Sequence, residues 1–164
     1  MKKSDNLYAE SMFYQLAAST GTKHASAKQA RGIINKLISK VGLNPKRYEI
    51  ADGSGLSLYN YLSAELEVQL LRYAFRNNNI YMHLRPSLPI AGEDGTLRKR
   101  MKGVFTAGNV HAKTGTVQGV SSLAGYCTAA NGHRLAFSII NQGIQHHSNG
   151  RAFQDRVCTV LCQP

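Results

Sequence analysis

Apolar residues spaced three or four positions apart predict helices in the first half of the chain. Residues 5–18 carry Tyr8, Met12 and Leu16 at every fourth position. Residues 26–41 give the clearest helical pattern, and Gly42 follows them as a C-terminal cap. The apolar stripe expected for this second helix consists of Ala30, Ile33, Ile34, Leu37, Ile38 and Val41.

A third helix is predicted over residues 63–75, where Ser63 is a favourable N-cap. Its buried side is expected to consist of Leu66, Leu70, Tyr73 and Ala74. Residues 52–55 are expected to form a turn, because two glycines with Asp and Ser favour tight bends. Residues 80–95 contain two prolines and are expected to be mostly loop, and residues 96–102 can add a helical turn.

The pattern changes to strands in the second half of the chain, with strands predicted over residues 110–116, 123–128 and 134–140. Asn131-Gly132 predicts a hairpin between the last two, because both residues tolerate positive φ. A closing helix is expected over residues 151–162. Its inward residues are predicted to be Phe153, Val157, Val160 and Leu161. Helices, a three-stranded antiparallel sheet and a final packed helix make an α+β fold, predicted as one domain over residues 1–164.

The net charge of +11 is the most unusual bulk property of the 164-residue chain. Nucleic-acid binding needs a concentrated basic stripe, but the lysines and arginines are scattered apart from one cluster at residues 98–102. A nucleic-acid partner is therefore not expected. No apolar run approaches the roughly 20 residues needed to cross a bilayer.

The chain has three cysteines, Cys127, Cys158 and Cys162, and this odd count argues against a disulfide framework. Buried thiols are the predicted state, and a bridge from Cys127 to the last helix stays open. No set of residues has metal-ligand spacing, so neither a metal nor another cofactor is expected.

Four short stretches stand out: Ser4-Asp5-Asn6, Asp52 to Ser57, Leu88 to Leu97, and Lys113-Thr114-Gly115, and the second and third are assigned no catalytic role. Each is weak alone, but Ser-Asp-Asn and Lys-Thr-Gly are motifs of penicillin-binding proteins and β-lactamases. In this order the four stretches resemble class C low-molecular-mass penicillin-binding proteins, the D-alanyl-D-alanine carboxypeptidases and endopeptidases of bacterial peptidoglycan. The resemblance covers essentially the whole chain, corresponds to the family's C-terminal portion, and implies a partial β-lactamase/transpeptidase-like fold.

The resemblance implies catalytic roles for Ser4, Asn6 and Lys113. Ser4 would carry a proton to the departing amine, Asn6 would bind the substrate amide, and Lys113 would attract the substrate carboxylate. Ser4 has a second interpretation as a helix N-cap, which the presence of Lys113 makes the less favoured one.

The resemblance also implies substrate binding by Thr114, Gly115 and Thr116. The two threonines would hold the terminal carboxylate, and the Thr116 N–H would donate to an oxyanion. Gly115 would allow the strand to approach the helix that carries the nucleophile. His111, two residues before Lys113, is interpreted as a packed or solvated histidine.

One family motif is missing, because no serine in the chain is followed by lysine at the third position. Either the chain is a truncated piece of a longer enzyme, or it is a short homologue that lost catalysis. The nearness of Ser4 to the start of the chain favours truncation. The isolated chain is therefore expected to be inactive and to form no covalent adduct with labelled penicillin.

The predicted function is that of the C-terminal part of a serine-type D-Ala-D-Ala carboxypeptidase or endopeptidase. The expected partners are peptidoglycan stem peptides, β-lactams and the missing N-terminal part of the same enzyme, in the periplasm or cell envelope. The alternative is a non-catalytic peptidoglycan-binding module, and a basic nucleic-acid-binding domain is the less favoured third hypothesis.

Overall fold

The computed structural model describes residues 1–163, which form two compact units. We call residues 1–4 together with the described residues from Glu67 onward the sheet unit, and Asp5–Leu66 the helical unit. Within residues 1–163, no helix combines the length and the apolar character needed to cross a membrane.

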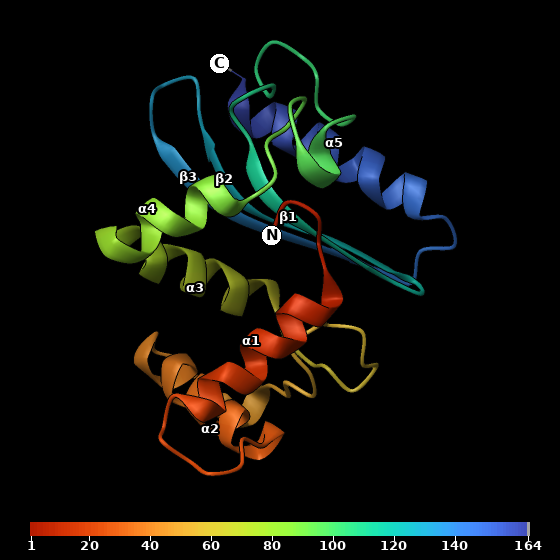
Figure 1. Ribbon diagram of the computed structural model, residues 1–164. Helices are drawn as coiled ribbons and strands as arrows, with labels where there is room; N and C mark the ends of the chain where they lie inside the picture. Colours follow the sequence, from red (N-terminus) through yellow and green to blue (C-terminus); the bar gives the residue numbers. More distant parts are fainter. Residues whose placement is uncertain (164) are drawn as a thin grey trace. The chain divides into compact units, whose positions relative to one another are not determined.

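The sheet unit contains a three-stranded antiparallel sheet, as predicted (Figure 1). Its strands are β1 (His111–Val117), β2 (Val120–Thr128) and β3 (Arg134–Gln142), in the order β1-β2-β3. The hairpin between β2 and β3 is confirmed, but only Gly132 takes a positive φ (82°). Its N–H donates to the Ala129 carbonyl (2.9 Å), which closes a turn that ends in a left-handed glycine.

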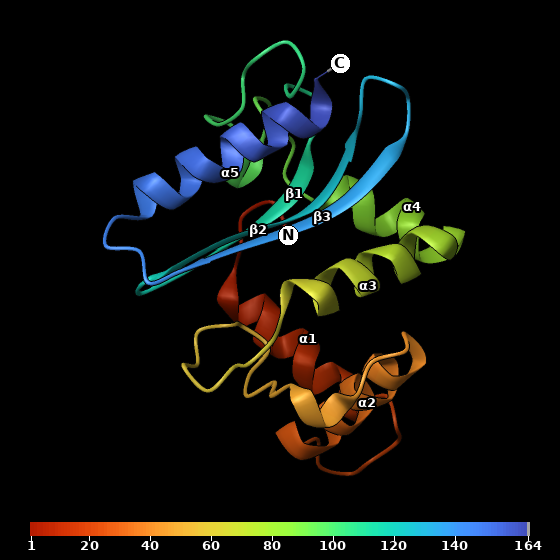
Figure 2. The same ribbon diagram turned by 180° about the vertical axis from the view of Figure 1, so that it is seen from behind.

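Helices cover both faces of this sheet, as Figures 1 and 2 show. Helix α5 (His147–Cys162) packs on one face, where Gln154 Nε2 donates to Ser121 Oγ (3.2 Å). The opposite face receives α3 (Ala64–Arg76) and α4 (Asn78–Ser87). On that face the Tyr126 hydroxyl donates to the Leu71 carbonyl (2.7 Å). Because side chains alternate along a strand, this arrangement fixes which face each β1 residue occupies.

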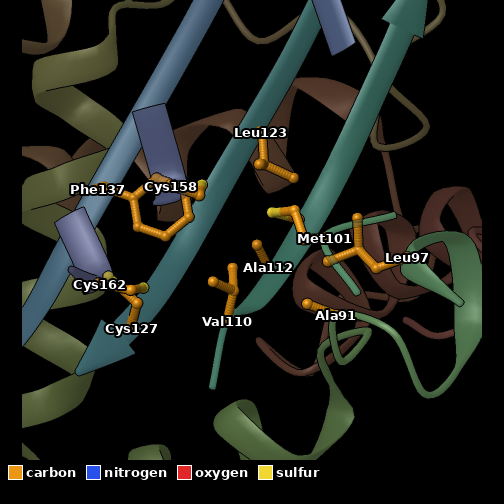
Figure 3. Close-up of a cluster of buried hydrophobic side chains, with 10 residues drawn as sticks. All are labelled: Ala91, Leu97, Met101, Val110, Ala112, Leu123, Cys127, Phe137, Cys158 and Cys162. Carbon is orange, nitrogen blue, oxygen red and sulfur yellow. The ribbon is translucent and has the colours of Figure 1, made fainter. Parts of the chain in front are cut away.

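The main core of the sheet unit lies between the sheet and α5 (Figure 3). Its buried members are Ala91, Leu97, Met101, Val110, Ala112, Leu123, Cys127, Phe137, Cys158 and Cys162. The three cysteines are free, buried thiols, as predicted. With the Ala112 side chain in this core, the next residue, Lys113, points to the opposite face.

The prediction of a loop over residues 80–95 is wrong for its first half, where α4 forms. Pro86 stands in the last turn of α4, so the hydrogen bond it cannot make and the kink its ring causes affect only the end of the helix. The helix is held by tertiary contacts: the Tyr81 ring packs edge-on against Phe75 (5.1 Å between centroids) and Tyr126 (5.2 Å). A short 3₁₀ helix, η2 (Gly95–Leu97), follows where a helical turn was predicted.

The closing helix is confirmed, and Leu161 packs against the core as predicted, but two of the four predicted inward residues are wrong. Phe153 and Val160 are 45% and 71% exposed, whereas Gln154 is fully buried. The buried stripe runs along Gly150, Gln154, Cys158 and Cys162. A polar side chain can lie in this stripe because Ser121 and Asn141 on the sheet accept hydrogen bonds from its amide.

The helical unit contains α1 (Asn6–Ala18), α2 (Ala27–Lys40) and the short 3₁₀ helix η1 (Pro45–Arg47). The first two confirm the predicted helices, and Ser26 begins α2 with a capping box. The buried contact between α1 and α2 is made by Phe13, Ala17 and Ala30. The residues whose spacing predicted α1 lie outside this contact: Tyr8, Met12 and Leu16 are exposed.

The predicted turn at residues 52–55 is confirmed in the helical unit. Asp52 accepts hydrogen bonds from the N–H groups of Gly55 (2.7 Å) and Ser57 (2.8 Å). Glu10 on α1 accepts from the N–H groups of Gly53 (2.8 Å) and Ser54 (3.0 Å). Two carboxylates therefore hold the backbone of this stretch in one conformation.

Candidate active site

The structure brings Ser4 and Lys113 together, although they are 109 residues apart in the sequence. Lys113 Nζ donates to Ser4 Oγ at 2.6 Å and to the Thr114 carbonyl oxygen at 2.6 Å. Partial burial lowers the pKa of the Lys113 ammonium from its ordinary value. A cation that donates to a hydroxyl in this way can orient the hydroxyl, attract an anion, and pass on a proton.

Ser4 reaches Lys113 from a tight turn at residues 1–4, in which the Ser4 N–H donates to the Met1 carbonyl (3.1 Å). Its φ of +54° lies in the left-handed region, which a residue with a side chain rarely adopts. The N-cap interpretation of Ser4 is wrong. Asp5 caps α1, because its carboxylate accepts from the Tyr8 N–H (3.1 Å).

Lys113 lies on β1, which is an edge strand of the sheet. The Ala112 N–H donates to the Pro89 carbonyl (3.0 Å), so it points away from β2 toward the edge. Backbone groups alternate along an antiparallel strand, so the N–H groups of Thr114 and Thr116 point to the same edge. The carbonyl that Lys113 contacts, that of Thr114, belongs to this row as well.

The side chains of the Lys-Thr-Gly-Thr stretch do not all share one face. Lys113 and Gly115 are on the α3 and α4 face, whereas Thr114 and Thr116 are on the α5 face. The Thr114 hydroxyl donates to the Thr96 hydroxyl (2.9 Å), and the Thr116 side chain is exposed. What these residues share is the open edge of β1, where the ammonium and the outward N–H groups meet.

Gly115 has a cross-strand reason to lack a side chain. It pairs with Ser122 on β2, and a Cβ built on Gly115 would overlap Ser122 Oγ. Sequence reasoning assigned this space to the helix that carries the nucleophile. The serine hydroxyl occupies it from within the sheet, and no motif in the sequence indicated Ser122.

Asn6, the third candidate catalytic residue, is the exposed first residue of α1 in the helical unit. Of the three candidate catalytic residues, Ser4 and Lys113 are therefore in direct contact, whereas Asn6 belongs to the other unit.

His111 is a packed residue, as predicted, with a relative exposure of 6%. Its Nε2 lies 2.9 Å from an Arg85 guanidinium nitrogen, which can only donate, so Nε2 accepts and the ring is neutral. Burial lowers the pKa of His111, and the positive charge of Arg85 lowers it further. Sequence reasoning missed Arg85, because α4 was not predicted and a lone arginine carries no signal. Within residues 1–163, no three His, Cys, Asp or Glu side chains form a group that could hold a metal.

The fold and the Ser4–Lys113 contact on an edge strand define the class, a penicillin-binding-protein fold. The solved structure of penicillin-binding protein 4 (dacB) from Haemophilus influenzae covers 100% of this chain, with a TM-score of 0.89 and 32% identity. The chain belongs to the D-Ala-D-Ala carboxypeptidase 3 (S13) family, whose model matches residues 1–163.

Two further comparisons give the extent of the likeness. A D-alanyl-D-alanine carboxypeptidase of Actinomadura sp. is 38% identical over an alignment of 173 residues, gaps included. The alignment covers 99% of this chain and 30% of that protein. The TLA-3 extended-spectrum β-lactamase matches with a TM-score of 0.59 over 93% of this chain and 62% of the other, and at 20% identity this shows the fold alone. The chain spans about a third of the length of its curated relatives, with 29% and 30% covered in the first two.

Proposed function

We propose that the chain is the C-terminal part of a serine-type D-Ala-D-Ala carboxypeptidase or endopeptidase that acts on peptidoglycan peptides. Family membership and the likeness to carboxypeptidases over nearly the whole chain support this proposal. The observation that carries it is the 2.6 Å contact between Lys113 Nζ and Ser4 Oγ. Two motifs recognised separately in the sequence supply the two atoms of that contact.

In the proposed reaction, Ser4 relays a proton to the departing amine, and Asn6 binds the amide of the substrate. The Ser4 hydroxyl accepts from Lys113, so its own proton is free to point at a leaving group. Because burial lowers the pKa of Lys113, its ammonium gives up a proton more readily than that of an ordinary lysine. The nucleophilic serine and its lysine partner would come from outside these 164 residues.

Substrate binding is proposed for the edge of β1. A peptide lying alongside this edge can use the outward backbone groups as an added strand does. The Thr116 N–H would donate to the oxyanion, Thr114 and Thr116 would hold the terminal carboxylate, and Gly115 would bind the peptide through its backbone. Lys113 adds the positive charge that a terminal carboxylate requires.

The proposed partners are peptidoglycan stem peptides, β-lactams and the remaining part of the enzyme. The Haemophilus protein has been solved in complex with a β-lactam. Because peptidoglycan lies outside the cytoplasmic membrane, the proposed location of the full-length protein is the periplasm or cell envelope.

The test is acylation of the full-length protein by a fluorescent penicillin, together with release of D-alanine from a D-Ala-D-Ala peptide. Lys113→Ala is expected to lower the acylation rate by about 10²-fold or more, as loss of a well-placed electrostatic group does. Lys99→Ala removes an exposed lysine from the same unit and should leave the rate unchanged. Equal rates in both variants would contradict the proposed role of Lys113.

The second candidate is a non-catalytic peptidoglycan-binding module, which the lack of a Ser-x-x-Lys sequence within the chain favours. It predicts that residues 1–164 alone bind peptides ending in D-Ala-D-Ala, with binding abolished by Lys113→Ala. The carboxypeptidase proposal instead needs the rest of the protein for any covalent labelling. Salt-dependent binding of DNA by the chain would support the third, nucleic-acid hypothesis.

A further inference from the structure

The turn that carries Ser4 is tied to the rest of the sheet unit by an ion pair. Lys2 Nζ lies 2.6 Å from Asp94 Oδ2. The interaction with Lys2 lowers the pKa of Asp94, so the carboxylate is charged at neutral pH. Lys2 is two residues from Ser4, and the Met1–Ser4 hydrogen bond joins the ends of the same turn.

Asp94 belongs to the stretch Leu88 to Leu97, which the sequence marked as characteristic of the family without giving it any chemistry. This stretch contacts β1 at two places: the Pro89 carbonyl accepts from the Ala112 N–H, and Thr96 accepts from Thr114. The stretch therefore contacts the residue before Lys113 and the residue after it on β1. Its own backbone is held by Asp94, whose Oδ1 accepts from the Ile90 N–H (2.8 Å).

The next residue, Gly95, brings the same stretch against the Ser4 turn. A Cβ on Gly95 would lie 2.7 Å from the Lys2 carbonyl oxygen, and its φ is +53°. The side chain of Asp94 and the bare backbone of Gly95 thus contact both ends of Lys2. One stretch touches the strand of Lys113 and the turn of Ser4.

We propose that Asp94 is a positioning residue, whose ion pair with Lys2 holds Ser4 Oγ within hydrogen-bond distance of Lys113 Nζ. The left-handed φ of Ser4 makes such an external anchor necessary, because an isolated turn would relax from that conformation. Asp94 also places a negative charge near Lys2 and His111. The link from this contact to catalysis rests on the proposed function, but the contact itself does not.

The test uses the full-length protein and the variants Asp94→Asn, Lys2→Met and the double variant. Asparagine keeps an oxygen for the Ile90 N–H and removes only the charge that pairs with Lys2. Each single variant is expected to lower the acylation rate by a fluorescent penicillin about three- to five-fold, the range of a partly exposed ion pair. The double variant should be no slower than either single one, because both remove the same interaction.

Asp155→Asn is the matched control. Asp155 pairs with Arg100 (2.7 Å) in the same unit, and the substitution makes the same change of charge away from the Ser4 turn. It should leave the acylation rate unaltered. Losses that multiply in the double variant, or an equal loss in the control, would overturn the proposal.

Hydrogen–deuterium exchange of the Ser4 amide gives a readout that does not depend on activity. This amide donates to the Met1 carbonyl, so its exchange should be several-fold faster in Asp94→Asn and Lys2→Met, and unchanged in Asp155→Asn. Unchanged exchange in the first two variants would refute the positioning role. If the unaltered protein is not acylated at all, the proposed function fails, and the exchange result alone still decides the role of Asp94.

Discussion

Gly125 on β2 pairs with Ala112 on β1, immediately before Lys113. A Cβ on Gly125 would lie 2.6 Å from the Ala112 Cα and would overlap the His111 carbonyl oxygen. Both neighbours are backbone atoms of β1, so no side-chain rotation can relieve the overlap. Gly125→Ala is therefore expected to push β1 away from β2 next to the candidate site.

The displacement follows from the contact distances. Moving the Ala112 Cα from 2.6 Å to the 3.4 Å at which ordinary contact begins requires a shift of about 0.8 Å. Overpacking of this kind costs about 1–3 kcal/mol. For a chain of this size, that loss lowers the unfolding temperature by roughly 2–12 °C. In the full-length protein, a shift of about 1 Å beside Lys113 can also slow acylation by about 10²-fold.

Thermal unfolding of the 164-residue chain, followed by circular dichroism, measures the first effect. Gly103→Ala is the control, because Gly103 has an ordinary φ and the nearest atom to its added Cβ would be Thr106 Oγ1 at 3.8 Å. It should unfold within about 2 °C of the unaltered chain, as expected for a change below about 0.5 kcal/mol. If Gly125→Ala unfolds with the control, the strand spacing around Lys113 does not depend on this glycine, and the reasoning is refuted.

Two further predictions concern buried titratable groups. Glu67 accepts a hydrogen bond from the Ser138 hydroxyl (2.5 Å), and burial raises the pKa of its carboxyl group. The protonated carboxyl group therefore stabilises the fold, and this contribution is lost as the pH rises through the raised pKa. Glu67→Gln should therefore increase resistance to urea at pH 7 and have little effect near pH 4; an equal effect at both pH values would contradict this. Burial raises the pKa values of Cys127 and Cys158 to about 12. Neither thiol should therefore react with iodoacetamide at pH 8 unless urea is added, as measured by mass spectrometry. Rapid alkylation of the native chain would show that the thiols are accessible.

Local patterns were sufficient where an element depends on its own residues. The capped, strongly amphipathic segment 26–41 predicted α2, and the hairpin at Gly132 fixed the pairing of β2 with β3. The two family motifs likewise identified Ser4 and Lys113 before any coordinates, because each is a short string of residues with a known chemistry.

Patterns failed where distant contacts outweigh local preference. The two prolines, Pro86 and Pro89, argued against α4, which the Tyr81 contacts stabilise. Gln154 was not expected in the core, because its partners on the sheet are 13 and 33 residues away in sequence. In both cases the sequence shows the residue but not the partner that makes its position favourable.

The sequence alone determined the fold class, the pairing of the last two strands and the identity of the two groups in the central contact of the candidate site. Only the tertiary structure decided what surrounds that contact. Asp94 pairs with Lys2 on one side, and the edge of β1 faces outward at Thr114 and Thr116. The physical reason is that helix and strand periodicity acts between near neighbours, whereas an ion pair between residues 2 and 94 needs a fold to bring its charges together.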